Sequence, residues 1–112
     1  MSVIGKIDRI LETVCDEVAK DVYEGKSDTY IVYNVAAEDP IGYHDDTPSD
    51  NIIYLQIHLY MPKDDDYTIL QNELKTAIFN GGFKFPRVSL NTVEKDTDKR
   101  HICYETNMAE SE

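Results

Sequence analysis

The segment from residue 51 to residue 61 constrains the fold most, because apolar and polar side chains alternate along almost all of it. Successive side chains of a β-strand point to opposite faces of a sheet, so this alternation predicts a long strand with one buried face. The expected core face carries Ile53, Leu55, Ile57, Leu59 and Met61. The opposite face carries Tyr54, Gln56, His58 and Tyr60, an amphipathic and tyrosine-rich set that suits contact with a partner.

Three other segments have the character of strands. Residues 28–37 are β-branched and aromatic almost throughout. Residues 83–91 contain Pro86, which favours a strand at the edge of a sheet because proline cannot donate a ladder hydrogen bond. Residues 100–108 form the last expected strand, after a charged turn at residues 92–99.

Two segments are expected to be helices. In residues 2–23 the apolar side chains recur at steps of three and four, with Ser2 as a plausible N-cap. The second helix begins after the acids of residues 64–66, which favour the positive end of a helix, and ends at the glycines of residues 81–82. The helical positions expected to face the core are Ile7, Leu11, Val14, Val18, Leu70, Leu74 and Ile78.

The order of these elements predicts an α+β fold, α-β-β-α-β-β, with a four-stranded, mainly antiparallel sheet and two helices packed on one face. Residues 1–108 are expected to form a single domain, and residues 109–112 a short acidic tail that frays.

Residues 38–50 are expected to form a long acidic loop, because Pro40, Gly42 and Pro48 interrupt the strand pattern. Connections of this length inside a small domain are uncommon and are usually functional or mobile. The acids of this loop are Glu38, Asp39, Asp45, Asp46 and Asp50.

The charge balance of the chain limits its partners. It has 22 acidic against 11 basic side chains, a formal net charge of -11. Phosphate and anionic lipid are bound through Lys and Arg, so wrapping a nucleic acid or docking on a membrane is disfavoured. The sequence has neither a membrane-length apolar run nor the pattern of a signal peptide, which predicts a cytoplasmic protein. Cys15 and Cys103 are expected to be reduced and buried as small apolar groups.

Few residues suggest catalysis or metal binding. His44 beside Asp45 and Asp46 could hold a divalent ion, but a metal site needs several ligands that converge in space. Cys103 and His101 share a face of the last strand, yet nothing marks an oxyanion hole or substrate pocket beside them. We therefore expect no catalytic residue, no cofactor and no bound metal.

Four stretches together resemble the tail completion, or tail terminator, proteins of tailed phages and prophages of Gram-positive hosts, which join head and tail. They are residues 28–33 after the first helix, residues 51–60, the helix that closes at Gly81-Gly82-Phe83, and residues 94–104 with His101. The likeness extends over residues 1–108 and lies in the order, the length and the residue character of the expected elements.

This resemblance implies a structural virion protein that is assembled in the cytoplasm of the bacterial host. Such subunits form a ring, commonly a hexamer, that caps the tail tube. The implied partners are further copies of the chain, the tail tube protein and the head–tail connector protein, with DNA only passing through the channel and no membrane involved. Like charge keeps DNA from sticking, so the acidic loop could line that channel or a subunit boundary. The outer face of residues 51–61 and the edge near Pro86 are candidate assembly surfaces.

Other interpretations stay open. The chain could be an acidic DNA mimic that inhibits a nucleic-acid-binding protein, or a neighbouring head–tail connector or minor tail component. A metal-dependent enzyme built on His44 and the nearby acids is a third alternative. A divalent ion shared between adjacent subunits would also relieve the repulsion within the acidic loop.

Overall fold

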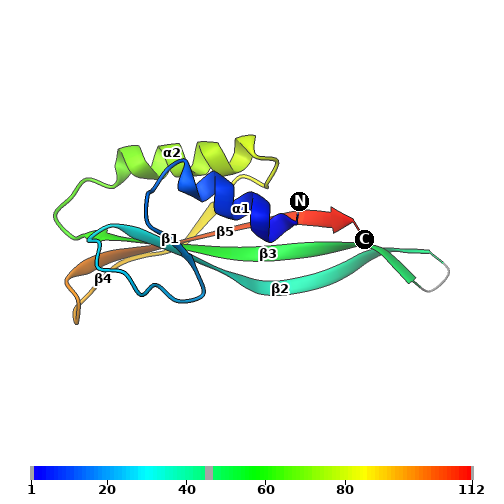
Figure 1. The fold of residues 1–112 in the computed structure, drawn as a ribbon, viewed down its shortest axis with the longest axis horizontal. Coiled ribbons are helices and arrows are strands. Elements are labelled where there is room, and N and C mark those ends of the chain that lie inside the picture. The colour runs from blue at the N-terminus through cyan, green and yellow to red at the C-terminus, as the bar shows by residue number, and fades with distance from the viewer. Residues whose placement is uncertain (1, 45–46, 112) are drawn as a thin grey trace.

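Five strands form one mixed sheet, and two helices lie on one of its faces (Figure 1). The computed structural model describes residues 2–44 and 47–111, except for the side chains of residues 43, 44, 47–49 and 111. In chain order the elements are α1 (Val3–Glu12), β1 (Val18–Lys20), β2 (Tyr30–His44), β3 (Thr47–Pro62), α2 (Thr68–Asn80), β4 (Arg87–Glu94) and β5 (Lys99–Ser111).

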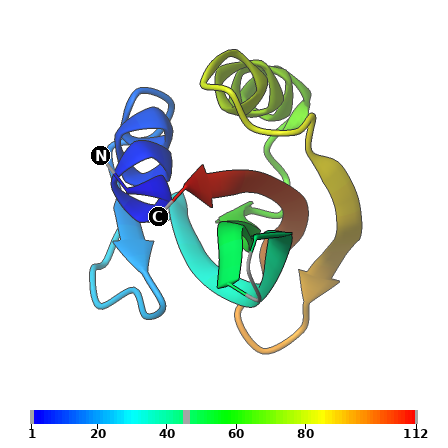
Figure 2. The ribbon, with the colours of Figure 1, turned by 90° about the vertical axis from the view of Figure 1, so that its right-hand side faces the viewer.

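The strand order across the sheet is β1-β2-β3-β5-β4. All neighbouring pairs are antiparallel except β1, which runs parallel to β2. The sheet is strongly curved, and both helices lie on the same side of it (Figure 2). The predicted α+β class is therefore confirmed, whereas the prediction of four strands missed the short fifth strand β1.

The first helix is much shorter than the sequence pattern predicted, because it ends at Glu12 and not near residue 23. The Thr13 hydroxyl donates to the Ile10 carbonyl oxygen at 2.6 Å, which closes the last turn. Beyond it the backbone pairs with β2, where Val18 lies beside Ile31. Val14 and Val18 still pack against the core, so their apolar assignment was right and only the helical conformation was wrong.

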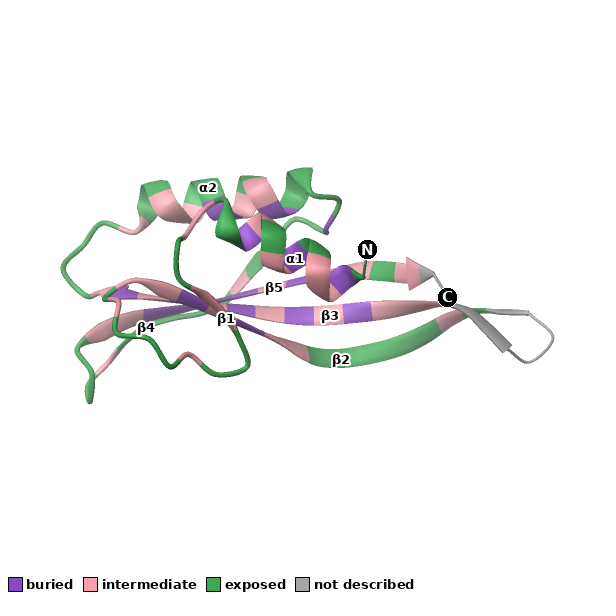
Figure 3. Ribbon diagram, viewed as in Figure 1, coloured by how far each residue is buried: buried purple, intermediate pink, exposed green. Residues whose placement is uncertain are grey.

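The core lies between the helices and the inner face of the sheet (Figure 3). All five side chains expected on the inner face of β3 are buried, and Tyr33 of β2 and Tyr104 of β5 are the largest fully buried side chains. Leu74 and Ile78 of α2 are buried as predicted, while Leu70 is partly buried against the same cluster. Gly81 ends α2 where the backbone comes close to the Ile10 side chain, and Gly82 has a positive φ of 97°.

The expected acidic loop at residues 38–50 is wrong, because β2 continues to His44 and β3 begins at Thr47. Glu38 pairs with Ile53, Asp39 with Ile52, and Asp50 with Ile41. A register shift between Val35 and Ala37 absorbs the change of pattern, and Pro40 is tolerated because β1 borders β2 only at residues 31–33. Asp45 and Asp46 lie outside the described residues.

This β2–β3 hairpin projects past the helices as an arm, and the molecule measures 54 × 26 × 23 Å (Figure 1). The third expected strand lies at the edge of the sheet, as predicted, but β4 begins at Arg87, after Pro86, and continues to Glu94 into the expected turn. The expected frayed tail is wrong for residues 109–111, which belong to β5, and Glu112 lies outside the described part. Neither described helix is long and apolar enough to cross a membrane.

Candidate functional site

The face of the sheet opposite the helices carries a row of aromatic and polar side chains. Strand register places Tyr30 beside Tyr60 and Tyr60 beside His101, while His58 lies between Val32 and Cys103. Alternation along each strand directs all of these side chains away from the core. The segment between β1 and β2 lies on this same face and places Tyr23 there (Figure 1).

Four rings form a continuous stack on this outer face. The centroid distances are 4.0 Å for Tyr23–Tyr30, 4.9 Å for Tyr30–Tyr60 and 4.3 Å for Tyr60–His101. The Tyr23 hydroxyl oxygen accepts a 2.9 Å hydrogen bond from the Ser27 amide, which fixes the ring at the end of the stack. The stack thus connects the irregular segment that carries Tyr23 to three strands, β2, β3 and β5.

A chain of polar contacts runs through the middle of this face. The Asn34 side-chain nitrogen donates to the Gln56 side-chain oxygen at 3.3 Å. The Asn34 oxygen lies 3.1 Å from His58 Nε2, and His58 Nδ1 lies 2.8 Å from His101 Nε2. His101 Nδ1 is 3.4 Å from the Glu94 carboxylate.

The side-chain oxygen of Asn34 determines which ring nitrogens of His58 and His101 donate hydrogen bonds. Because the Asn34 oxygen can only accept, His58 carries its proton on Nε2, and its Nδ1 accepts from His101 Nε2. The contact between His101 Nδ1 and the Glu94 carboxylate is then a hydrogen bond only if His101 also carries a proton on Nδ1. Burial, and then the neighbouring His101, lowers the pKa of His58, which agrees with a neutral His58.

A hollow of about 420 Å³ lies beside the ring stack. Its aromatic and histidine wall is formed by Tyr23, Tyr30, Tyr60 and His58, and two carboxylates, Asp21 and Glu94, also line it. Burial, followed by the charge of Glu94, raises the pKa of both Tyr30 and Tyr60. We call this space the tyrosine hollow.

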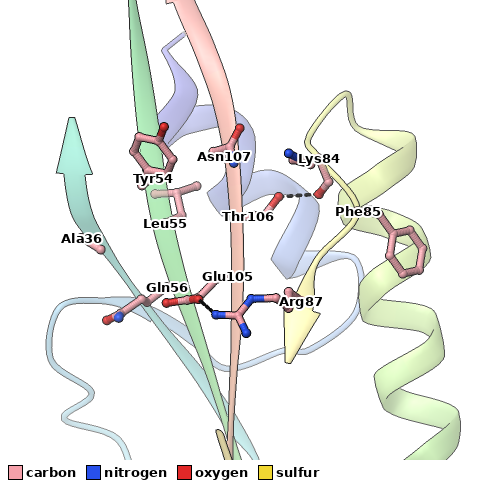
Figure 4. A pocket seen from close by; sticks show the side chains of 10 residues that line it. All are labelled: Ala36, Tyr54, Leu55, Gln56, Lys84, Phe85, Arg87, Glu105, Thr106 and Asn107. Carbon is pink, nitrogen blue, oxygen red and sulfur yellow. Dashed lines mark hydrogen bonds and ion pairs between the residues drawn. The ribbon is translucent and has the colours of Figure 1, made fainter. Parts of the chain in front are cut away.

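A second hollow, of about 320 Å³, lies farther along the sheet toward the arm (Figure 4). Arg87 crosses it to form a 2.6 Å ion pair with Glu105, and the Thr106 hydroxyl donates to the Lys84 carbonyl oxygen. Phe85 points away from these polar groups and makes an edge contact with Phe79. Both phenylalanines are more than half exposed, at 55% and 54%.

The structure places the four residues of the expected assembly surface on one face, as predicted, but it divides them between these two hollows. Tyr60 and His58 belong to the stack and the polar chain, whereas Tyr54 and Gln56 line the second hollow. All four are half-buried. Tyr60 has a ring on each side, Tyr30 and His101, whereas no ring stacks on Tyr54 among the described residues.

The acids expected in a single loop are separated by the strands. Glu38 and Asp39 are exposed neighbours on β2, so their side chains point to opposite faces, and Asn51 donates to Glu38 at 3.1 Å. Asp50 lies on β3, and the other two acids are outside the described residues.

The pair suggested by Cys103 and His101 does not form as a thiol–imidazole contact, since both ring nitrogens of His101 face other groups. Burial raises the pKa of the Cys103 thiol, which lowers its fraction of reactive thiolate. His44 has no described side chain, and no three His, Cys, Asp or Glu side chains converge on a metal-sized site within residues 2–42 and 50–110.

No pattern in the sequence indicated the contacts made by Asn34, Glu94 and Tyr23. Their positions depend on strand register and on a long irregular segment, and neither can be derived from local periodicity. No family model matches the chain, and no curated protein matches it. The case for a function therefore rests on the residues themselves.

Proposed function

We propose that the chain is a structural subunit of the head–tail region of a tailed phage, a tail completion or terminator protein that assembles into a ring on the tail tube. The observation that carries this proposal is the projecting β2–β3 arm. The proposal starts from the resemblance of the sequence to that family in the order and length of its elements. Three features of the surface support assembly.

The end of the arm extends beyond the strand that supports it on the other side of β3. Beyond the pair Asp50–Ser111, where β5 ends, the described part of the hairpin consists of β2 and β3 alone. A two-stranded ribbon is marginally stable by itself in water. An arm of this kind gains stability when it lies against a neighbouring subunit, so its length favours a protein that works in an assembly.

The sheet also presents two different edges. From Asn34 onward no described strand borders the outer side of β2, and none borders the outer side of β4. Two unlike edges can meet head to tail around a ring, whereas a closed dimer would use the same edge twice. Glu38, Asp39 and Pro40 on the β2 edge would limit unspecific strand pairing.

An exposed aromatic pair gives a third candidate contact. Phe79, in the last turn of α2, contacts Phe85 at a centroid distance of 5.8 Å, close to the start of β4. Large exposed rings of this kind often mark protein–protein contacts.

The acids of the arm fit the same proposal, although they lie on strands and not in a loop. Because they lie on both faces of a two-stranded ribbon, one face would meet a subunit boundary in a ring and the other would face the channel. Like charge along the channel would keep DNA from adhering as it passes. Replacement of Glu38, Asp39 and Asp50 by their amides should leave rings intact and slow DNA ejection if the channel face matters.

The deciding experiment removes the arm and keeps the body. Ile41 and Asp50 are paired across the hairpin, so residues 42–49 can be replaced by Asn-Gly, which favours a two-residue turn. Native mass spectrometry and electron microscopy would follow ring formation, alone and with the tail tube protein of the same phage.

We expect rings for the natural chain and folded monomers for the shortened one. The Asp96→Asn variant, changed in an exposed turn, is the control and should form rings normally. A natural chain that stays monomeric with tail tubes would overturn the proposal, and specific binding of that monomer to a nucleic-acid-binding protein would favour the DNA-mimic alternative.

A further inference from the structure

The tyrosine hollow has the chemistry of a site for a positively charged group. Its carboxylates, Asp21 and Glu94, lie beside three aromatic rings, and no Lys or Arg is among the described residues that line it. The ammonium nitrogen of Lys99 lies 5.6 Å from the centroid of the Tyr30 ring, and it donates to the Asp28 carbonyl oxygen at 2.6 Å, outside the lining of the hollow. Lys20 pairs with Asp21 at the exposed rim, where such a pair contributes little.

Three acceptor groups in the hollow have spare capacity. Glu94 contacts His101 through Oε2, and its Oε1 has no partner among the described residues. The hydroxyls of Tyr30 and Tyr60 likewise have no hydrogen-bond partner in the described part of the chain, although both rings are half-buried. Carboxylate and hydroxyl oxygens accept hydrogen bonds from N–H groups, so the hollow suits a ligand that carries several N–H donors.

The lining of the hollow also has an apolar part, which suits a ligand with an apolar segment next to its charged group. Val22 and Val32 line it, and Val22 is one of the most exposed large apolar residues, at 65%. An arginine side chain combines three methylene groups with a planar guanidinium that donates five hydrogen bonds and accepts none. Its stem would cover the valines while its head reaches the acceptors.

We propose that the tyrosine hollow binds an arginine side chain presented by a partner protein, with the guanidinium between Glu94 and the hydroxyls of Tyr30 and Tyr60. The open form of the hollow favours a side chain on a larger surface, because a free small molecule that presents the same group would bury little area and bind only weakly. The net charge of -11 would also speed the approach of a basic partner. This inference does not require that the chain form a ring.

The test uses the full chain labelled with ¹⁵N and titrated with N-acetyl-argininamide, followed by NMR chemical shifts. The neutral analogue N-acetyl-citrullinamide has nearly the same shape and lacks the charge. N-acetyl-lysinamide has the positive charge but lacks the planar guanidinium group. We expect saturable shifts around Tyr30, Tyr60 and Glu94 with the arginine compound, weaker binding of the lysine compound, and none with citrulline.

Two variants assign the binding to the hollow. Glu94→Gln keeps the shape and a donor–acceptor side chain, and should weaken binding about tenfold through loss of the charge-assisted hydrogen bond. Tyr60→Phe keeps the ring stack and should weaken binding by about threefold. The matched control, Glu73→Gln, makes the same chemical change on an exposed position of α2, across the sheet, and should bind like the natural chain.

Equal binding of arginine and citrulline compounds would overturn the proposal, as would equal affinities of the Glu94→Gln and Glu73→Gln variants. Lysine binding as tight as arginine binding would refute the guanidinium assignment. Shifts clustered away from the hollow would refute the location.

Discussion

The backbone amide of Val3 donates a 2.7 Å hydrogen bond to the Glu110 carboxylate, which joins two residues 107 positions apart in the sequence. Val3 is the first residue of α1, where the amide groups have no partner within the helix and the helix dipole favours negative charge. Ser2 serves the same helix end, since its hydroxyl accepts from the Gly5 amide. An acidic segment that was expected to fray therefore has a partner that keeps it in β5.

Glu110→Gln should lower the free energy of unfolding by about 0.5–1.5 kcal/mol, because the amide keeps the shape but loses the charge at the helix end. Urea denaturation followed by circular dichroism measures this cost. Glu73→Gln, in the exposed middle of α2, is the matched control and should change stability by less than about 0.5 kcal/mol. Equal effects of the two variants would show that the carboxylate at α1 contributes nothing specific.

Leu55→Ala and Leu74→Ala should each lower the free energy of unfolding by about 2–5 kcal/mol, since both side chains are buried at 1% exposure or less and their loss leaves a cavity. Thermal and urea denaturation measure the loss. The control is Ile69→Ala on α2, which removes a similar volume from a side chain that is 70% exposed. If Ile69→Ala were as costly as Leu74→Ala, the assignment of the buried face of α2 would be wrong.

Tyr33→Phe should cost about 1–2 kcal/mol, because the Tyr33 hydroxyl donates a 2.6 Å hydrogen bond to the Asp8 carboxylate and so connects β2 to α1. The ring itself remains, so the core volume is unchanged. Tyr54→Phe is the matched control, since the Tyr54 hydroxyl has no hydrogen-bond partner among the described residues. A double-mutant cycle with Asp8→Asn should assign most of the cost to this pair, and additive effects would argue against a direct bond.

The local sequence pattern was sufficient to predict the conformation of some elements and insufficient for others. The alternation of β3 fixes its buried face within one segment, and the acids before α2 with the glycines after it mark both ends of that helix. Val14 and Val18, by contrast, are spaced as a helix requires, and the partner that draws Val18 into a strand is the distant Ile31. In the hairpin arm, Pro40, Gly42 and Pro48 suggested a loop, whereas β2 and β3 pair with each other through this segment.

The candidate site depended even more on distant residues. The outer face of β3 could be predicted, since side-chain period is a local property. The contact between His58 and His101 requires the register of β3 against β5, and Glu94 reaches His101 only because β4 lies on the other side of β5. Each of these registers is set by packing of the whole sheet.

The stability of the protein should depend on pH through His58. Burial and the neighbouring His101 lower its pKa in the folded protein below the ordinary value of 6.5. In the interval between these two values the unfolded chain binds more protons at this site, so stability rises with pH there. The contribution of the neutral ring is complete above about pH 6.5 and is lost as the pH falls through the folded-state pKa.

His58→Gln separates this effect from other titrations, because glutamine keeps one acceptor for His101 and one donor for Asn34 without titrating. His101 and Glu94 face the position from β5 and β4 and are present in both proteins, as are Tyr60 and Cys103. We expect urea denaturation between about pH 7.5 and pH 5 to show a larger loss of stability for the natural chain than for the variant. Parallel curves would mean that His58 does not titrate in this range. A larger loss for the variant would reverse the sign and imply that the ring is held in its charged form.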